Sequence, residues 1–330
     1  MSADSATVYL RTYLAPLAFL LERAEVTDIF INKPGEVWVE TVLGSIERHL
    51  APELDETTLW RLARQIASFS NQGVNREHPL LAATLPSGER VQIIAPPATR
   101  GDIAIAVRKH VVANLSLEDY DRSDAFAHAR TDGRSDSEAL DRDLRSLLDA
   151  RNMAGFLRAA VKGRKNIIVS GGTSTGKTTF LNALLKEVPR EERLILIEDA
   201  AEVQLDHPNA IGLVAVRGET GEAKVTTEDL VQASLRMRPD RIILGELRGK
   251  EATSFLRAVN TGHPGSITTL HADSPAGAVD QLSLLVLQAG LQLSRAEIAD
   301  YVRSVVDVFV QLSRRDGRRM ISEIVFKPST

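Results

Sequence analysis

The order of apolar and polar positions divides the chain into two regions with a charged stretch between them. Residues 1–112 alternate short strand and helix signals, whereas from residue 152 short continuous apolar runs alternate with helical segments. Runs that are apolar on both faces are typical of parallel strands buried between helices. The pattern therefore predicts a smaller α+β domain at 1–112 and an α/β domain with a doubly wound, mostly parallel sheet at 152–330.

The N-terminal region contains the signals of an antiparallel sheet. Asp55 precedes a run with apolar residues at helical spacing, and a Pro-Ser-Gly turn at 86–88 separates two apolar runs in the manner of a hairpin. The expected elements are helices at 16–25 and 55–69 and strands at 27–32, 36–42, 80–85, 89–95 and 102–110.

The C-terminal region predicts five buried strands, at 166–171, 193–199, 211–216, 241–246 and 266–271. Helical segments separate them, at 178–188, 228–237, 251–260 and 276–287. We expect the chain to close as a hairpin that turns at Asp316 and Gly317, since Asp-Gly between apolar runs is a strong hairpin signal.

The stretch at 113–151 reads as a linker. Between residues 116 and 151 there are ten acidic residues and six arginines, which favours a solvated segment that becomes helical near 139–150. A linker of this length would permit a domain-swapped assembly, in which one domain lies over a neighbouring copy.

Bulk composition narrows the function classes. The net charge is −4 and cysteine is absent, which excludes disulfides and zinc-thiolate sites and favours a cytoplasmic protein without specific nucleic-acid binding. No apolar run has the roughly 20 residues that span a bilayer. The first 25 residues could form an amphipathic helix on the membrane surface, but they lack a lysine-rich face, so we favour packing inside the N-terminal domain.

Residues 171–178, GGTSTGKT, match the phosphate-binding pattern G-x-x-x-x-G-K-[ST] between a buried strand and a helix. Backbone N–H groups of such a loop surround phosphate oxygens, the lysine reaches the β- and γ-phosphates, and the hydroxyl after it binds Mg²⁺. The alternative is a glycine turn with a surface lysine. We expect ATP and Mg²⁺ to bind at Gly171, Gly172, Thr173, Ser174, Thr175, Gly176, Lys177, Thr178 and Thr179.

Two acidic residues end buried strands in this region. Glu198 ends 193–199 and Glu246 ends 241–246, and the carboxyl ends of parallel strands meet at the edge that carries the phosphate loop. With Thr178 they are the expected Mg²⁺ ligands, in part through water, although each could merely cap the next helix. His263 and His271 flank the last strand, and His271 could sense the γ-phosphate.

Three segments, at 171–185, 196–203 and 235–274, together resemble the secretion (traffic) ATPase family. They carry a phosphate loop, an Asp box, a Walker B strand with a glutamate, and a His box, in that family's order. Within the family the chain resembles the hexameric ATPases of type IV secretion and conjugation systems. The resemblance implies a RecA-like ATPase domain, a homo-hexamer, inner-membrane partners of a type IV system, and peripheral association with the inner membrane.

The resemblance also implies roles for single residues. Glu246 matches the Walker B acid that acts on the Mg²⁺ shell or the attacking water, Glu198 matches the Asp-box acid, and His271 matches the His-box histidine. Arg90 and Arg108 fit positions from which the family's N-terminal domain lends arginines to the nucleotide, although they could also be surface residues of strands. Weaker candidates for phosphate or inter-subunit contacts are Arg217, Arg236, Arg238 and Arg248.

Other classes of protein also use a phosphate loop. A RecA-like nucleic-acid motor or helicase needs a basic channel and stacking aromatic residues, and aromatic residues are only 5% of this chain. A small-molecule phosphotransferase needs a second substrate pocket, which no motif indicates. A scaffold that binds ATP but hardly hydrolyses it can be separated from a motor only by measuring the rate of ATP hydrolysis. We therefore expect an ATPase that powers translocation or pilus assembly.

Overall fold

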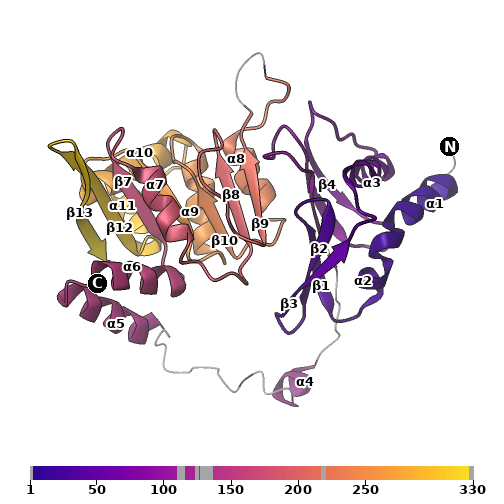
Figure 1. Cartoon of the computed structure of the whole chain (residues 1–330), viewed down its shortest axis with the longest axis horizontal. Helices are drawn as coiled ribbons and strands as arrows, with labels where there is room; N and C mark the ends of the chain where they lie inside the picture. Colours follow the sequence, from indigo (N-terminus) through magenta and orange to yellow (C-terminus); the bar gives the residue numbers. More distant parts are fainter. Residues whose placement is uncertain (1–2, 110–115, 123–125, 127–136, 217–220, 327–330) are drawn as a thin grey trace.

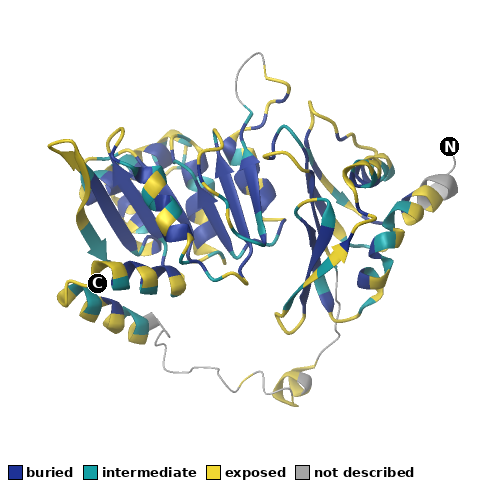
Figure 2. Cartoon of the chain, viewed as in Figure 1, coloured by how far each residue is buried: buried dark blue, intermediate teal, exposed yellow. Residues whose placement is uncertain are grey.

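The computed structural model describes residues 3–109, 116–122, 126, 137–216 and 221–326. Two sheets, each with its own helices, lie side by side in Figure 1, with the N-terminal sheet on the right and the C-terminal sheet on the left. The inner strands of both sheets are mostly buried, and the exposed residues lie mainly on the edge strand β13 and on the outer helices and loops (Figure 2).

The N-terminal sheet has six strands in the order β3-β2-β1-β6-β5-β4, and every neighbouring pair is antiparallel. The strands are β1 (Val26–Ile31), β2 (Gly35–Thr41), β3 (Ile46–Ala51), β4 (Leu80–Thr84), β5 (Arg90–Ile94) and β6 (Ala104–Arg108). The accompanying helices are α1 (Ala3–Leu14), the short η1 (Ala15–Leu17), α2 (Ala18–Glu22) and α3 (Glu56–Phe69).

Both faces of the N-terminal sheet are covered. On one face, α1–α3 pack against side chains such as Ile29 and Ile105; on the other, Phe30 and Trp38 join the core of the C-terminal domain. Asp55 caps α3 by accepting a hydrogen bond from Thr58 N at 2.7 Å, as its position predicted. The first helices pack inside the domain through Leu10, Leu17 and Leu20, which are fully buried or nearly so.

The C-terminal sheet has seven strands in the order β13-β12-β7-β11-β10-β8-β9. All neighbours are parallel except the closing pair β12–β13. The strands are β7 (Ile167–Gly171), β8 (Leu194–Glu198), β9 (Ala210–Val214), β10 (Arg241–Leu244), β11 (Ile267–Leu270), β12 (Val308–Arg315) and β13 (Arg318–Phe326). Asp316 and Gly317, both with positive φ, form the two-residue turn of the expected hairpin.

Helices cover both faces of this sheet. One core joins it to α8 (Thr227–Ser234), α9 (Glu251–Asn260), α10 (Pro275–Gln288) and α11 (Arg295–Val305). The other joins it to α5 (Ser137–Asp149), α6 (Met153–Lys162) and α7 (Lys177–Leu185). The expected doubly wound α/β domain behind an α+β domain is therefore confirmed.

The expected linker contains two helices within its described residues. The short α4 (Leu117–Arg122) is exposed, whereas α5 buries Leu144 completely in the C-terminal core. The helix expected near 139–150 is thus part of the packing of the C-terminal domain, and the domain limits 1–112, 113–151 and 152–330 stay a prediction. Four elements of the described part of the chain have no counterpart among those expected: β3, α4, α6 and α11.

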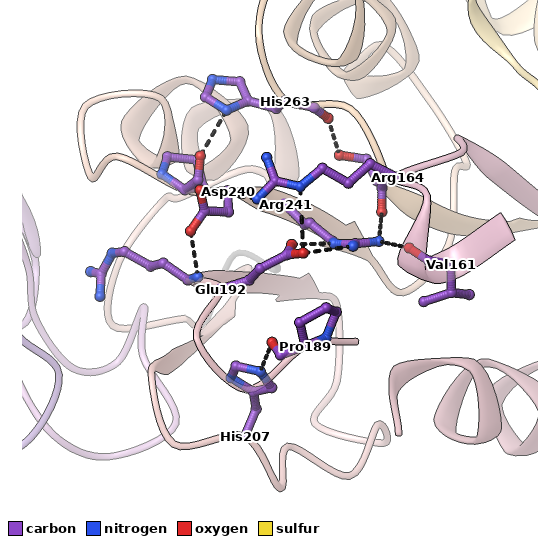
Figure 3. Close-up of polar contacts among 12 residues, drawn as sticks. Val161, Arg164, Pro189, Glu192, His207, Asp240, Arg241 and His263 are labelled. Atoms are coloured by element: carbon purple, nitrogen blue, oxygen red, sulfur yellow. Dashed lines mark hydrogen bonds and ion pairs between the residues drawn. The ribbon is translucent and has the colours of Figure 1, made fainter. Parts of the chain in front are cut away.

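Charged side chains are buried at the amino ends of the parallel strands. Arg241, the first residue of β10, is fully buried and binds Glu192 through two hydrogen bonds, of 2.5 and 2.9 Å. Its remaining nitrogen donates to the carbonyls of Val161 at 2.7 Å and Gly265 at 3.2 Å (Figure 3). Because the guanidinium has an acceptor on each side, its charge is compensated inside the core.

Arg193, which precedes β8, joins the two domains. Its guanidinium lies 4.0 Å from the ring centroid of Phe30 and donates to Asn32 Oδ1 at 2.7 Å and Asn209 Oδ1 at 2.8 Å. Arg238 forms ion pairs with Glu40 of the N-terminal sheet and with Asp240. These contacts dock the N-terminal sheet on the loops at the amino ends of β8 and β10.

We predict that Glu192→Gln destabilises the protein by about 3 kcal/mol, because it leaves the Arg241 charge buried without a counter-ion. Burial alone would raise the pKa of Glu192, but hydrogen bonds and charge from Arg241 outweigh burial and hold the pKa below its usual 4.5. A carboxyl group with a lowered pKa stabilises the fold above its unfolded-state pKa and loses this effect as the pH falls. The difference between the two proteins should therefore shrink below about pH 4.5.

Urea unfolding at several pH values measures this difference. Arg295→Ala is the control, because the Arg295–Asp280 pair is mostly exposed and its loss should change stability little. Equal unfolding midpoints for Glu192→Gln and the unchanged protein at pH 7 would contradict the prediction.

Candidate active site

The phosphate loop connects β7 to α7 and is shaped by two positions. Gly176 has φ +94°, in the left-handed region that favours glycine. A Cβ on Gly171 would lie 2.6 Å from Thr175 Oγ1 and 2.9 Å from Leu312 O, so only glycine fits there. Thr175 Oγ1 donates to Gly172 O at 2.9 Å, which closes the loop on itself. The sequence motif is thus a tight backbone loop at the amino end of a helix.

Lys177 is the first residue of α7, and its side chain returns over the loop. Nζ donates to Gly171 O at 2.9 Å and to Gly172 O at 3.1 Å, and it lies 3.5 Å from His271 Nε2. Burial lowers the pKa of Lys177, and the nearby charge of Glu246 partly opposes this shift. The position places a cation at the centre of the loop, where phosphate binding requires one.

Glu246 lies two residues beyond the end of β10 and is held from two sides. His271 Nε2 lies 3.1 Å from Glu246 Oε1, and Arg248 donates to Oε2 at 2.7 Å. The hydrogen bond to Glu246 raises the pKa of Arg248. Thr269 Oγ1 on β11 donates to Gly245 O at 2.7 Å, which joins the ends of β10 and β11. A glutamate, a histidine and the loop lysine therefore meet in one place.

Glu198, the last residue of β8, is almost fully buried. Its Oε1 accepts hydrogen bonds from Glu202 N at 3.0 Å and Val203 N at 2.8 Å, and its Oε2 pairs with Arg100 of the N-terminal domain. Arg100 reaches it across β9, where a Cβ on Gly212 would lie 2.4 Å from Arg100 Cδ. The N-terminal domain thus contacts the expected Asp-box acid of its own chain.

These groups surround a cavity of about 310 Å³ at the carboxyl edge of the C-terminal sheet. The phosphate loop lines this cavity together with Glu198, Asp199, Glu246 and His271. Of the expected nucleotide and metal residues, the cavity is lined by Thr173, Ser174, Thr175, Gly176, Lys177, Thr178, Thr179, Glu198, Glu246 and His271. Gly171 and Gly172 are not among the lining residues, and their carbonyl oxygens accept hydrogen bonds from Lys177 Nζ.

Arg90 and Arg108 lie elsewhere in the single chain. They are paired in register on β5 and β6 and line a second cavity of about 630 Å³, together with Gln92 and with Arg236 near the end of α8. Among the described residues, the two cavities have no lining residue in common. Three further arginines were weaker candidates for phosphate or inter-subunit contacts. Arg248 lines the first cavity, Arg238 lies at the domain interface, and Arg217 is outside the described residues.

Sequence reasoning missed two arginines near the first cavity. Arg100 follows β5 in an irregular segment and reaches Glu198 over Gly212. The sequence did contain a signal for this approach, because a glycine inside an expected strand often marks a place where another chain segment comes close. Arg319 of β13 lines the cavity wall, and its contact with the loop has no signal in the local sequence.

Comparison with known proteins agrees with this geometry. A family model described as "Type II/IV secretion system protein" matches residues 134–323. The type IV secretion system protein VirB11 of Bartonella henselae is 35% identical, over 99% of this chain and 95% of that protein. The Brucella suis VirB11 protein is 39% identical, over 96% of this chain and 90% of that protein.

The chain belongs to the type II/IV secretion system protein family. A solved structure of the same class, the Brucella suis VirB11 ATPase in complex with sulphate, matches with a TM-score of 0.91 and 37% identity, over 98% of this chain and 96% of that one. The family confirms the enzyme class that the motifs indicated, an ATPase of a type IV secretion system. The alternative of a nucleic-acid motor is not favoured. Among the described residues of this family member, no helix is long and apolar enough to cross a membrane.

We predict that Glu246→Gln slows ATP hydrolysis at least about a hundredfold, because the amide cannot accept a proton or orient water as a carboxylate does. ATP binding should persist, since the phosphate loop is unchanged. Steady-state turnover and binding of a fluorescent ATP analogue measure the two effects. Asp300→Asn, at an exposed position on α11, is the control. Loss of binding equal to the loss of rate would indicate a structural role instead.

Proposed function

We propose that the chain hydrolyses ATP in the cavity at the carboxyl edge of the C-terminal sheet and that this reaction powers a type IV secretion system. One observation carries the proposal: Lys177 Nζ, His271 Nε2 and the Glu246 carboxylate follow one another at 3.5 and 3.1 Å beside a phosphate loop. A phosphate-binding cation, a hydrogen-bonding ring and a carboxylate are the groups that phosphoryl transfer to water requires.

Each residue has a task in this proposal. The loop N–H groups of residues 173–179 and the Lys177 ammonium bind the phosphates and stabilise the charge that develops on them. Glu246 orients the attacking water and accepts its proton, with His271 holding the carboxylate. Arg248, hydrogen-bonded to Glu246, restrains the same carboxylate from the outer side. Glu198 lines the same cavity.

The residues also fit the Mg²⁺ ion that ATP carries. Among the residues described, no group of three or more His, Asp or Glu side chains could hold a metal by protein atoms alone. Mg²⁺ in nucleotide sites usually binds one or two protein oxygens, waters and the phosphates, so the hydroxyl of Thr178 and the carboxylates of Glu246 and Glu198 are a sufficient donor set. When bound, the ion would neutralise charge on the transferred phosphoryl group.

The position of Arg90 and Arg108 favours a ring with shared sites. Both arginines lie together on adjacent strands at the rim of the second cavity, apart from the P-loop cavity of their own chain. If they serve a nucleotide, it is that of a neighbouring copy, and head-to-tail contacts of this kind form a ring where the rotation between copies closes. We therefore propose a homo-hexamer at the cytoplasmic face of the inner membrane, in contact with membrane components of the secretion system.

Lys177→Ala should abolish measurable ATP turnover, because the loop loses the cation at its centre. Lys186→Ala, an exposed position just beyond the same helix, is the matched control and should leave turnover unchanged. Release of phosphate from ATP under saturating nucleotide measures the effect. Unchanged turnover in Lys177→Ala would place the reaction outside this cavity.

Mixed assemblies test whether the arginines act between chains. Arg108→Ala and Lys177→Ala should each be nearly inactive alone. After mixing and reassembly at equal amounts, a shared site regains activity wherever an intact Lys177 meets a neighbour's intact Arg108, which is about a quarter of the sites if copies mix at random. No recovery on mixing would show that Arg108 serves its own chain, and full turnover of Arg108→Ala alone would remove it from the site.

A further inference from the structure

The edge hairpin β12–β13 contacts the phosphate loop through one side chain. Arg319 Nε donates to the carbonyl oxygen of Ser174 at 3.2 Å, and Arg319 lines the nucleotide cavity. The stem of the side chain lies over the loop as well, since Arg319 Cδ would be 3.2 Å from a Cβ placed on Gly176. Within the described part of the chain, no carboxylate lies within ion-pair distance of Arg319.

Ser174 is the position of the loop that most needs support. Its φ is +62°, in the left-handed region that side-chain-bearing residues rarely adopt unless their surroundings hold them there. The side chain of Thr175 ties the next residue to Gly172 O, but the Ser174 carbonyl is held by Arg319. A residue some 145 positions away along the chain therefore stabilises the strained turn.

Anchoring this carbonyl has a consequence for phosphate binding. The Ser174–Thr175 peptide is trans, so its C=O and N–H point in opposite directions. Holding the Ser174 oxygen consequently fixes the direction of Thr175 N–H, and the cradle of a phosphate loop is made of such N–H groups. If the peptide rotates, one donor of the cradle turns away.

The hairpin that carries Arg319 is fixed at its other end. Phe326, the last residue of β13, packs edge-on against Phe156 of α6, with ring centroids 5.7 Å apart, and Arg145 of α5 lies over its ring at 6.0 Å. Eight residues of β13 pair with β12, which pairs in turn with β7, the strand that leads into the loop. The position of Arg319 is therefore set by the same sheet that positions the loop.

We propose that Arg319 is a positioning residue of the nucleotide site: its Nε–H holds the Ser174 carbonyl and so directs Thr175 N–H to the phosphates of a nucleoside di- or triphosphate. This deepens the proposed function and rests on it. The part of the side chain that acts is the donor at the ε position, with the stem packed on Gly176. The role requires the donor and the stem, and it requires no contact between the positive charge and the nucleotide.

Two substitutions of similar length separate the donor from the charge. Arg319→Gln keeps an N–H donor at the ε position and removes the charge, whereas Arg319→Met keeps the apolar stem and removes both. We expect Arg319→Met to weaken ADP and ATP binding about tenfold, the usual effect of one lost hydrogen bond to a bound anion. Arg319→Gln should bind like the unchanged protein. Arg318→Met, the exposed neighbouring position, is the control.

Isothermal titration with ADP and thermal unfolding of the full chain are the measurements. Equal weakening in Arg319→Gln and Arg319→Met would show that the charge contacts the nucleotide, which overturns the positioning role. Unchanged binding in Arg319→Met overturns it as well. Lys177→Ala separates failure of this inference from failure of the proposed function. If Lys177→Ala binds ADP normally, the proposed function fails. If Lys177→Ala loses ADP binding while Arg319→Met binds ADP normally, only the inference about Arg319 is refuted.

Discussion

The parallel pairing of β7, β11, β10 and β8 is the constraint on which the site depends. In this register Ile167, Ile267, Ile243 and Leu196 lie level across the sheet, so the four strands end along one edge. Each chemical group follows its strand by at most a few residues: the phosphate loop after β7, His271 after β11, Glu246 after β10 and Glu198 at the end of β8. A shift of one strand by one residue would turn its side chains to the opposite face and remove its group from the cavity.

The two edges of this sheet are built differently, and the difference suits a motor. At the amino edge the buried Arg241 and Glu192, with Asn166 and Asp307, form closed networks in which the charges are compensated. At the carboxyl edge, Ser174 and Gly176 have left-handed backbone angles and the charged side chains face a cavity. A rigid base therefore supports a region whose polar groups are available to a ligand.

Docking of the N-terminal sheet extends this base beyond one domain. Phe30 and Trp38 enter the larger core, Arg193 stacks on Phe30, and Arg238 pairs with Glu40. As a result Arg100 reaches Glu198, while Arg90 and Arg108 face another cavity. Glu198, which lines the cavity at the phosphate loop, is thereby in direct contact with the N-terminal domain through Arg100.

Local chemistry in the sequence determined the phosphate loop, the strand-end acids, His271, the capped helix at Asp55 and the hairpin at Asp316, because each depends on neighbouring residues or on a strand's burial pattern. The polar edge strand β3 was missed because exposure on one side of it removed the apolar signal. Only the tertiary structure decided which arginines approach the cavity at the phosphate loop. Arg100 and Arg319 arrive there from distant segments through domain docking and sheet order, whereas Arg90 and Arg108 are carried elsewhere. Gly212 marks a close approach at its strand without indicating which residue approaches, and the contact of Arg319 leaves no pattern in the local sequence.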